Sequence, residues 1–427
     1  MKRALVYLFG LLGTLSSAQS EFENIRLGIS SAFGRGLCEP SIAISPADPA
    51  HMVAGSILDQ VFTSQDSGRS WQRDTLTSPY GVWGDPVLHA DQAGNFYYFH
   101  LSDPTGRNWQ SEEILDRIVV QRSVNNGKTW SEGSYFGYNP PKDQDKHWVA
   151  EDPQKGIIYA TWTQFDKYGA KDSSFRSNIL FSASADSGLS WRAPMIISEN
   201  SGNCLDGDST TEGAVPAVGP NGELYVTWSY AGHLYFDRSL DQGQTWLPKD
   251  RVIAQQPGGW DIDIPGLLRC NGMPVTVANR STGDHRGEVY VLWVDDRRGN
   301  YDVWFTRSKD RGDSWSEPLR INDDDSEADQ FLAWLDVDQS TGYLYAVFYD
   351  RRNYNDNRTD VFLAISQNGG ETWKNIRISA SPFTPVESVF FGDYNHIDVQ
   401  NGVVRPIWTR FENGQLSIWT ALINQLP

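Results

Sequence analysis

Short apolar runs that end in polar turn residues recur along the chain, and they predict β-strands. Four kinds of run follow one another: residues 40–44 exemplify the first, 288–293 the second, 302–307 the third and 319–321 the fourth. The chain has 17 Trp and 18 Tyr but only 4 Met, which fits this pattern because aromatic and β-branched side chains favour strands. We therefore predict an all-β fold.

One eight-residue pattern, S-x-[DN]-x-G-x-[ST]-W, occurs six times and defines a repeat. Consecutive copies lie roughly 55 to 70 residues apart, the length of a four-stranded propeller blade with its loops. The copies begin at Ser64, Ser123, Ser184, Ser239, Ser308 and Ser366.

Each fixed position of this pattern, the Asp box, has a structural reason. Asp or Asn accepts backbone N–H groups across a tight turn, Gly takes a positive φ, and Trp packs against the neighbouring blade. Asn125 and Asn368 replace the aspartate in two copies. We expect these turns to stabilise the fold and to take no part in catalysis.

The last part of the chain predicts a seventh blade that borrows a strand from the N-terminus. Residues 391–399, 403–408 and 416–422 resemble first, second and third strands, and no Asp box or fourth strand follows them. Residues 23–30 resemble a fourth strand and could pair with residues 416–422, which would leave no exposed strand edge. A single β-propeller of seven four-stranded blades is preferred, and six blades is the alternative.

The N-terminus has the features of a cleaved signal peptide. Two basic residues precede an apolar run over residues 4–15, and small residues lead to Ala18. The run is too short to cross a bilayer. We predict a signal peptide over residues 1–18, a propeller over residues 19–427, and a secreted protein, extracellular or periplasmic.

Charge and cysteine content narrow the partners. The chain has 54 acidic and 36 basic residues and a formal charge of −18, which disfavours nucleic acid and anionic membranes. The three cysteines allow at most one disulfide, which we expect between Cys204 and Cys270, and we expect Cys38 to be a buried core residue. A monomer is expected.

Strand direction alternates within a blade, so the starts of the first strands and the loops between second and third strands share one face. The Asp boxes lie on the other. Propellers usually hold their ligand near the central channel. The polar residues that precede first strands are Glu39, Asp85, Glu151, Glu212, Gln330, Asp393 and Tyr394, and the loops add Asp59, Arg297, Arg352 and Arg410. Carboxylates brought together there would have raised pKa values suited to acid catalysis, whereas the Asp-Arg pairs could be salt bridges between loops.

The sequence gives little indication of a metal site. No two histidines have the spacing of zinc ligands, so no metal is assigned to the site. Residues 206–208 and 322–325 are rich in Asp and offer oxygen ligands for a structural Ca²⁺, with solvated loops as the alternative. No organic cofactor is expected.

The six Asp boxes and the signal peptide make the mature chain resemble bacterial secreted proteins of the sialidase superfamily. In that family a tyrosine activated by a glutamate attacks the anomeric carbon, and an aspartate is the acid/base. The segment 392–397 is similar to the one that carries the tyrosine, and 211–215 to that of the glutamate. The resemblance implies Tyr394 as nucleophile, Glu212 as its base and Asp59 as acid/base.

The chain departs from the family in its arginines. Sialidases hold the substrate carboxylate with three arginines, but residues 38–40 read Cys-Glu-Pro where the family has Arg-Ile-Pro, and residues 228–230 read Trp-Ser-Tyr near the place of the second arginine. The candidates for substrate binding are therefore Arg35, Asp85, Arg297, Arg352, Asp393 and Arg410.

Two functions follow from these residues. The first is a secreted sialidase-like exo-glycosidase that hydrolyses a terminal sugar, sialic acid among the options, from a glycan or glycoconjugate. The alternative is a non-catalytic extracellular propeller that binds a glycan or a protein. Loss of the arginine triad favours the alternative.

Overall fold

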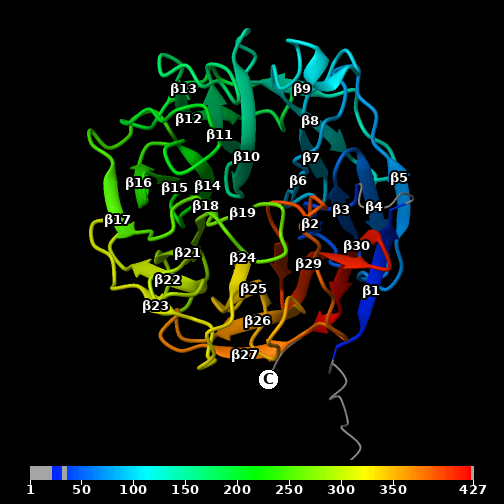
Figure 1. Cartoon of the computed structure of the whole chain (residues 1–427). Helices are drawn as coiled ribbons and strands as arrows, with labels where there is room; N and C mark the ends of the chain where they lie inside the picture. Colours follow the sequence, from blue (N-terminus) through cyan, green and yellow to red (C-terminus); the bar gives the residue numbers. More distant parts are fainter. Residues whose placement is uncertain (1–21, 31–35, 425–427) are drawn as a thin grey trace, which may run out of the picture.

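The computed structural model describes residues 22–30 and 36–424 as seven antiparallel sheets arranged around a central axis (Figure 1). Each sheet is one blade of a β-propeller, and neighbouring strands in a blade are consecutive in the sequence, except in the last blade. The predicted all-β propeller of seven blades is confirmed. Among the described residues, no helix is long and apolar enough to cross a membrane.

Each blade has four strands, which follow one another from the axis outward. Blade 1 contains β2 (Ser41–Ile44), β3 (Met52–Ser56), β4 (Gln60–Ser64) and β5 (Gln72–Thr75). Blade 2 contains β6 (Val87–Ala90), β7 (Phe96–Leu101), β8 (Ile118–Ser123) and β9 (Ser134–Phe136). Blade 3 contains β10 (Asp143–Asp152), β11 (Ile157–Phe165), β12 (Ser177–Ser184) and β13 (Met195–Ile196). Blade 4 contains β14 (Glu212–Val218), β15 (Leu224–Tyr230), β16 (His233–Ser239) and β17 (Arg251–Gln255).

The remaining blades follow the same order. Blade 5 contains β20 (Val275–Ala278), β21 (Val289–Asp295), β22 (Asp302–Ser308) and β23 (Leu319–Arg320). Blade 6 contains β24 (Gln330–Val337), β25 (Leu344–Asp350), β26 (Asp360–Ser366) and β27 (Lys374–Arg377). Blade 7 contains β28 (His396–Gln400), β29 (Val403–Glu412), β30 (Gln415–Ala421) and β1 (Asn24–Ile29), with β31 (Ile423–Asn424) paired to β29. A two-stranded sheet of β18 (Asp261–Ile262) and β19 (Cys270–Asn271) and the short 3-10 helix η1 (Asn108–Gln110) lie outside the blades.

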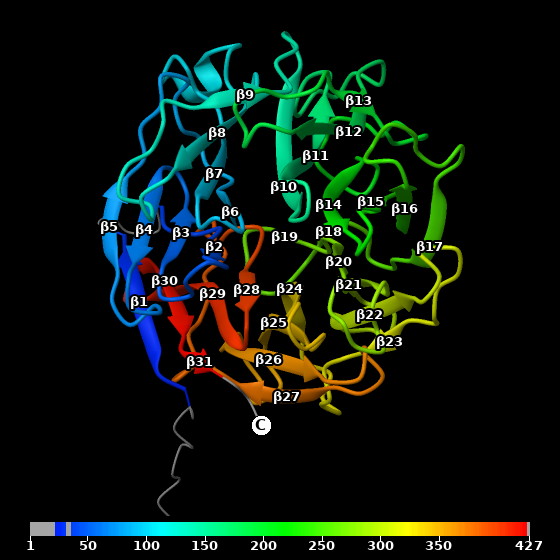
Figure 2. The ribbon, with the colours of Figure 1, turned by 180° about the vertical axis from the view of Figure 1, so that it is seen from behind.

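The ring closes as predicted. Strand β1 pairs antiparallel with β30, and Asn24 lies opposite Ala421 while Ile29 lies opposite Ser417. Figures 1 and 2 both show the N-terminal strand beside the C-terminal blade. This pairing gives blade 7 the fourth strand that its own sequence lacks.

The six repeated turns between third and fourth strands share one hydrogen-bond arrangement. In the first, Asp66 Oδ1 accepts the Ser70 N–H at 2.9 Å, and the Ser70 hydroxyl donates to Asp66 Oδ2 at 2.6 Å. The Gly68 N–H donates to Ser64 Oγ at 2.9 Å, and Gly68 has a φ of +83°. The turn thus satisfies its backbone groups locally.

The tryptophan that ends a turn packs against the preceding blade. Trp246 of the fourth turn meets Phe181 of blade 3 with ring centroids 5.0 Å apart, and Trp315 meets Phe236 of blade 4 at 5.1 Å. These edge-to-face contacts bury apolar surface between blades. The expected structural role of the tryptophan is therefore confirmed.

Side chains also join the inner strands of adjacent blades. The Leu88 N–H donates to Ser41 Oγ at 3.0 Å, and the Val399 N–H donates to Asp336 Oδ2 at 2.8 Å. Such contacts satisfy backbone N–H groups that face the next blade instead of a paired strand. They hold the inner strands at fixed positions around the axis.

The disulfide expectation was wrong. Cys38, Cys204 and Cys270 are free and buried. Cys204 and Cys270 are instead small side chains in the protein interior, and Cys38 is buried as predicted.

Candidate functional site

Seven residues, one from each blade, occupy equivalent places where the inner strands begin. In each blade, one residue of the inner strand begins the continuous pairing with the second strand, and the residue two positions before it is the one meant here. In blade 3, for example, Trp148 begins this pairing and Lys146 stands two positions before it. The seven ring residues are Glu39, Asp85, Lys146, Gly213, Met273, Leu332 and Tyr394. We call the face that holds them the loop face, and the face that holds the six repeated turns the turn face.

The backbone of the ring is conformationally unusual. Five of the seven residues have positive φ: Glu39 (53°), Asp85 (50°), Lys146 (49°), Gly213 (74°) and Leu332 (47°). Four of these are not glycine, and such a conformation costs roughly 1 kcal/mol or more per residue. Strain of this kind persists where the surroundings fix it, and it is concentrated at binding and catalytic sites.

One ring residue, Lys146, is a buried cation that binds carboxylates from other blades. Lys146 Nζ is 2.5 Å from Asp393 Oδ2 and 3.8 Å from Asp85 Oδ2, and its side chain is 4% exposed. Arg269 also binds Asp393, with its Nε 2.9 Å from Oδ1 and a second contact from its terminal nitrogen to Oδ2. Burial opposes ionisation of Asp393, but Arg269 and Lys146 outweigh it and hold its pKa well below the usual range.

The other buried carboxyl groups near Lys146 and Arg269 have raised pKa values, in contrast to Asp393. Burial, reinforced by the charges of Asp85 and Asp393, raises the pKa of Glu39. Burial also raises the pKa of Glu212 and that of Asp145. A raised pKa means that a carboxyl group keeps its proton to higher pH than usual, so these groups are candidate proton donors beside the ionised Asp393.

Two carboxylate oxygens here have no hydrogen-bond partner among the described residues. Thr163 donates to Glu212 Oε2 at 3.1 Å, but Glu212 Oε1 is buried and unpaired. Asp85 Oδ2 is likewise buried with no hydrogen bond. Buried polar atoms are rarely left unpaired, so these two oxygens are candidates for contact with a ligand. We call the whole group the loop-face cluster; its members are Glu39, Asp85, Asp145, Lys146, Asp206, Glu212, Arg269, Asp393 and Tyr394.

A short insertion between blades 4 and 5 covers the cluster. Strands β18 and β19 project onto the middle of the ring in both views (Figures 1 and 2). The inward side chains Trp260, Ile262 and Ile264 are buried, and Asn271 Nδ2 donates to the Asp393 carbonyl at 2.9 Å. The insertion thereby delivers Arg269 to the cluster.

The structure brings Tyr394 and Glu212 into the same cluster without a hydrogen bond between them in the described part of the chain. The Tyr394 hydroxyl contacts the Pro86 carbonyl at 3.5 Å. Burial, then the charges of Asp85 and Glu39, raises the pKa of Tyr394. Asp59 lies in the turn between β3 and β4, where its Oδ1 accepts the Gln60 side-chain amide at 2.5 Å.

Three of the four candidate arginines form ion pairs within their own blades. Arg297 Nε is 2.9 Å from Asp295 Oδ1, and Arg352 Nε is 2.7 Å from Asp350 Oδ2. Arg410 contacts the Glu412 carboxylate and the Ser381 hydroxyl. Arg35 lies outside the described residues. These three arginines therefore form salt bridges, mainly with acids two positions away in their own blades rather than between loops as the alternative had it.

Sequence reasoning missed Lys146, Asp145 and Arg269, and it misplaced Glu151. Strand β10 begins at Asp143, so Glu151 stands near its far end, where its Oε2 is 3.1 Å from His89 Nε2. Lys146 could have been identified from its position two residues before Trp148, which matches the position of Glu39 before Ser41 in blade 1. The spacing between the Asp boxes at Ser239 and Ser308 is the longest of the five, which indicates an insertion there, and Arg269 lies in that insertion.

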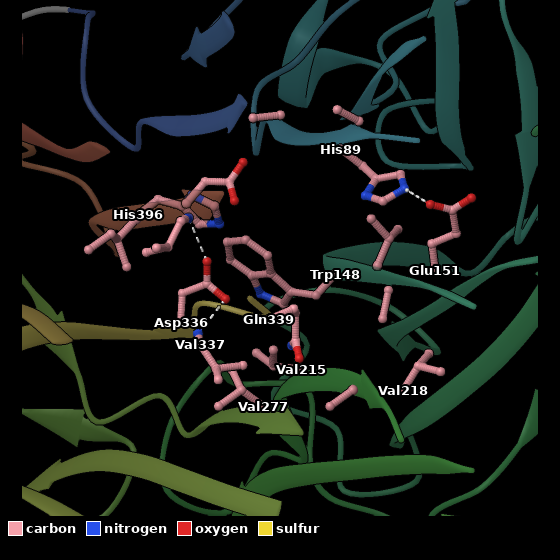
Figure 3. A pocket seen from close by; sticks show the side chains of 18 of the residues that line it. His89, Trp148, Glu151, Val215, Val218, Val277, Asp336, Val337, Gln339 and His396 are labelled. Carbon is pink, nitrogen blue, oxygen red and sulfur yellow. Dashed lines mark hydrogen bonds and ion pairs between the residues drawn. The ribbon is translucent and has the colours of Figure 1, made fainter. Parts of the chain in front are cut away.

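A polar channel lies between the inner strands of the propeller (Figure 3). This channel has a volume of about 210 Å³ and is lined by the inner strands of all seven blades. Trp148 and Trp334 contact each other there with ring centroids 4.2 Å apart. The channel also holds the His89–Glu151 pair, but its carboxylates Asp336 and Asp398 accept backbone N–H groups of neighbouring strands.

The described residues contain no group of three or more His, Cys, Asp or Glu side chains that could hold a metal ion. In the two acidic loops, Asp206 binds Tyr168 and Arg269, and Asp324 binds Asn322 and Ser326. These carboxylates therefore already have protein partners.

The fold defines the class of this protein: a seven-bladed β-propeller with a buried ionic cluster on its loop face. No family model matches the chain, and no curated protein does. Solved structures do resemble it. An ulvan lyase of polysaccharide lyase family PL25, bound to -[GlcA(1-4)Rha3S]-, has a TM-score of 0.54 and 12% identity, over 93% of this chain and 96% of the lyase.

Two further structures have similar scores. The NanB sialidase from Streptococcus pneumoniae gives a TM-score of 0.51 and 11% identity, over 87% of this chain and 83% of the sialidase. A protein of unknown function from Dyadobacter fermentans gives 0.51 and 14%, over 78% and 94%. At these identities the likeness concerns the fold alone.

Proposed function

We propose that this chain is an exported, glycan-acting propeller that hydrolyses a terminal sugar at the loop-face cluster. The observation that carries the proposal is the set of buried carboxyl groups around Lys146 and Arg269 at the axis, where propellers bind their ligands. Protonated and ionised carboxyl groups side by side are what acid/base hydrolysis of a glycosidic bond requires. Sialidases and a polysaccharide lyase among structures of this fold support a glycan as the substrate.

Glu212 is the group we assign as proton donor. Its buried carboxyl has a raised pKa, one oxygen held by Thr163 and the other free to face a leaving oxygen. Tyr394 is the proposed nucleophile. Asp85 has the largest charge effect on it and an oxygen without a hydrogen bond among the described residues, 3.8 Å from Lys146 Nζ, so we assign Asp85 as the acceptor of its proton. Asp59 is kept as a further acid/base candidate from the family resemblance.

The test is release of 4-methylumbelliferone from a panel of aryl glycosides that includes the sialoside. We expect turnover by the parent protein and a loss of about 100-fold or more in Glu212→Gln and Tyr394→Phe. Asp241→Asn, in a repeated turn on the other face, should leave turnover unchanged. A folded parent protein that turns over no glycoside would contradict the proposal.

A second candidate function is binding without catalysis. It is favoured by the low exposure of the two key side chains, 3% for Tyr394 and 0% for Glu212, and by arginines that are paired with acids of their own blades. A glycan array separates the two functions, because retention of an intact glycan with no released sugar supports binding alone.

The proposal includes export and a glycan partner. Export rests on residues 1–18, which lie outside the described part of the chain. N-terminal sequencing of the protein recovered from periplasm or medium should begin at Gln19. A protein that retains Met1 and stays in the cytoplasm would overturn this part of the proposal.

A further inference from the structure

Three aromatic side chains, the exposed Trp109 and the partly buried Trp83 and Tyr168, form a group on the loop face beside the cluster. Trp109 stacks on Tyr168 with ring centroids 5.5 Å apart and an interplanar angle of 24°, and Trp83 meets Trp109 edge to face at 6.1 Å. Trp109 belongs to η1 in the β7–β8 loop, and Tyr168 to the β11–β12 loop. We call these three residues the aromatic platform.

Trp109 stands out among the aromatic residues. It is 57% exposed, and it is the one Trp among the large exposed apolar side chains of the described residues. By contrast, Trp162, Trp228 and Trp293 are fully buried in second strands. A large ring left in water on a face with a polar site is typical of a binding surface.

The platform is continuous with the loop-face cluster. The Tyr168 hydroxyl donates to Asp206 Oδ2 at 2.7 Å, and the Tyr168 N–H donates to Asp143 Oδ2 at 2.7 Å. Asp206 in turn is 3.4 Å from the terminal nitrogen of Arg269, which holds Asp393. The platform and the cluster are therefore neighbours on the loop face, connected through Tyr168, Asp206 and Arg269.

We infer that the aromatic platform binds the inner sugar units of an uncharged oligosaccharide whose terminal sugar meets the loop-face cluster. This inference rests on the proposed function and names its substrate class. One face of a pyranose ring presents C–H groups that pack flat on an aromatic ring. Its hydroxyl groups can bond at the rim of the platform, where the exposed Lys167 and Glu112 lie 3.4 Å apart.

Charge decides against an acidic glycan. Both cations of the cluster, Lys146 and Arg269, already bind Asp393, so neither is free to hold the carboxylate of an acidic sugar. The chain as a whole carries a formal charge of −18, which repels an acidic glycan. An uncharged chain instead meets hydrogen-bond partners and an aromatic surface.

The experiment measures fluorescence anisotropy of end-labelled hexasaccharides with the full mature chain. The panel holds uncharged β-glucan, mannan, xylan and N-acetylglucosamine hexamers, together with hexagalacturonate and a sialylated hexasaccharide. We expect at least one uncharged hexamer to bind, and Trp109→Ala to weaken it about fivefold or more. Trp109→Phe should recover most of the affinity because it restores a ring.

Leu189→Ala is the matched control, since Leu189 is an exposed apolar side chain of a repeated turn on the opposite face, 68% exposed. It should bind as the parent does. Equal affinity of the parent and Trp109→Ala overturns the inference, as does binding confined to the acidic hexamers or no binding at all. The two proposals fail separately: a hexamer that binds the parent and binds Trp109→Ala more weakly, with no turnover by the parent, would contradict hydrolysis at the cluster and keep the platform. Turnover by the parent with equal affinity of the parent and Trp109→Ala would overturn the platform alone.

Discussion

The two faces of the propeller use acidic residues in opposite ways. On the turn face, hydrogen bonds from Thr245 and Ser314 lower the pKa values of Asp241 and Asp310 to about 2, and both side chains are close to solvent. On the loop face, burial raises the pKa values of Glu39 and Glu212. The same chemical group is therefore satisfied and ionised on one face, and desolvated and inclined to keep its proton on the other.

This difference distinguishes the residues that stabilise the fold from the residues that we associate with function. The turn-face arrangement occurs six times with nearly the same distances, and each turn is complete in itself. The loop-face cluster occurs once and draws residues from blades 1 to 4, from blade 7 and from the insertion. The charged groups of the loop-face cluster are costly to bury, and their arrangement occurs only once. We therefore associate this cluster, and not the repeated turns, with function.

The largest effect is expected when the ring that supports both faces is opened. Deletion of residues 19–30 removes β1, and with it the whole ladder between β1 and β30 and the bond from the Ser30 N–H to the Leu416 carbonyl. The melting temperature should fall by roughly 5 °C or more because several hydrogen bonds and buried side chains are lost together. A melting temperature within a degree or two of the parent would show that the ring closes without this strand.

Removal of the central cation should strongly destabilise the loop face. Lys146→Met leaves Asp85 and Asp145 buried without their cation, which typically costs about 3–5 kcal/mol. Lys155→Met is the matched control, because Lys155 is 40% exposed and its partner Asp152 is 3.7 Å away. That change should stay within about 0.5 kcal/mol. Thermal unfolding of both variants at pH 7 checks the difference, and equal melting temperatures would contradict the importance of the cluster.

The pH dependence of stability should differ between the faces. Glu212 has a raised pKa in the folded state, so the folded protein binds more protons than the unfolded chain above about pH 4, where an unfolded Glu titrates. Its contribution is favourable at low pH and is lost as pH rises. Glu212→Gln removes this loss, so its melting temperature relative to the parent should increase from pH 5 to pH 9. A constant or decreasing difference would show that Glu212 ionises freely.

The smallest effect is expected in a repeated turn. Asp241 has a lowered pKa of about 2, so its stabilising contribution is present above about pH 4 and is lost as pH falls toward 2. Asp241→Asn should keep the turn, since Asn125 and Asn368 accept the same backbone N–H at 3.0 Å. At pH 7 its melting temperature should shift by no more than about 2 °C. Between pH 4 and pH 2 the parent should lose stability faster than the variant.

The periodic part of the structure could be predicted from the sequence. Six copies of one turn, spaced by one blade each, specify four-stranded repeats, and the missing fourth strand of the last repeat predicts closure by residues 23–30. Local geometry carries this information, because the bonds from Asp66 to Ser70 span only four positions.

The cluster could be predicted only in part. Asp85, Glu212, Asp393 and Tyr394 were found because they precede inner strands, but Lys146 and Arg269 approach Asp393 from 247 and 124 positions away. Such contacts depend on where β10 starts and how the insertion folds. The sequence marks the positions of Lys146 and Arg269, but it does not show that both meet Asp393. A salt bridge of Arg297 with a nearby aspartate could be predicted as an alternative to substrate binding, because Asp295 is only two positions away in the sequence.

The central claim is that the loop-face cluster, and neither the turns nor the channel, contacts the glycan. Hydrogen–deuterium exchange of the mature chain, with and without the hexasaccharide of highest affinity, tests it whether or not hydrolysis occurs. Protection is expected in peptides that contain Asp85, Lys146, Arg269 and Asp393, with the six repeated turns unchanged. Protection confined to the turns, or to channel peptides that contain Arg280 and Asp336 and no residue of the cluster, would contradict the claim.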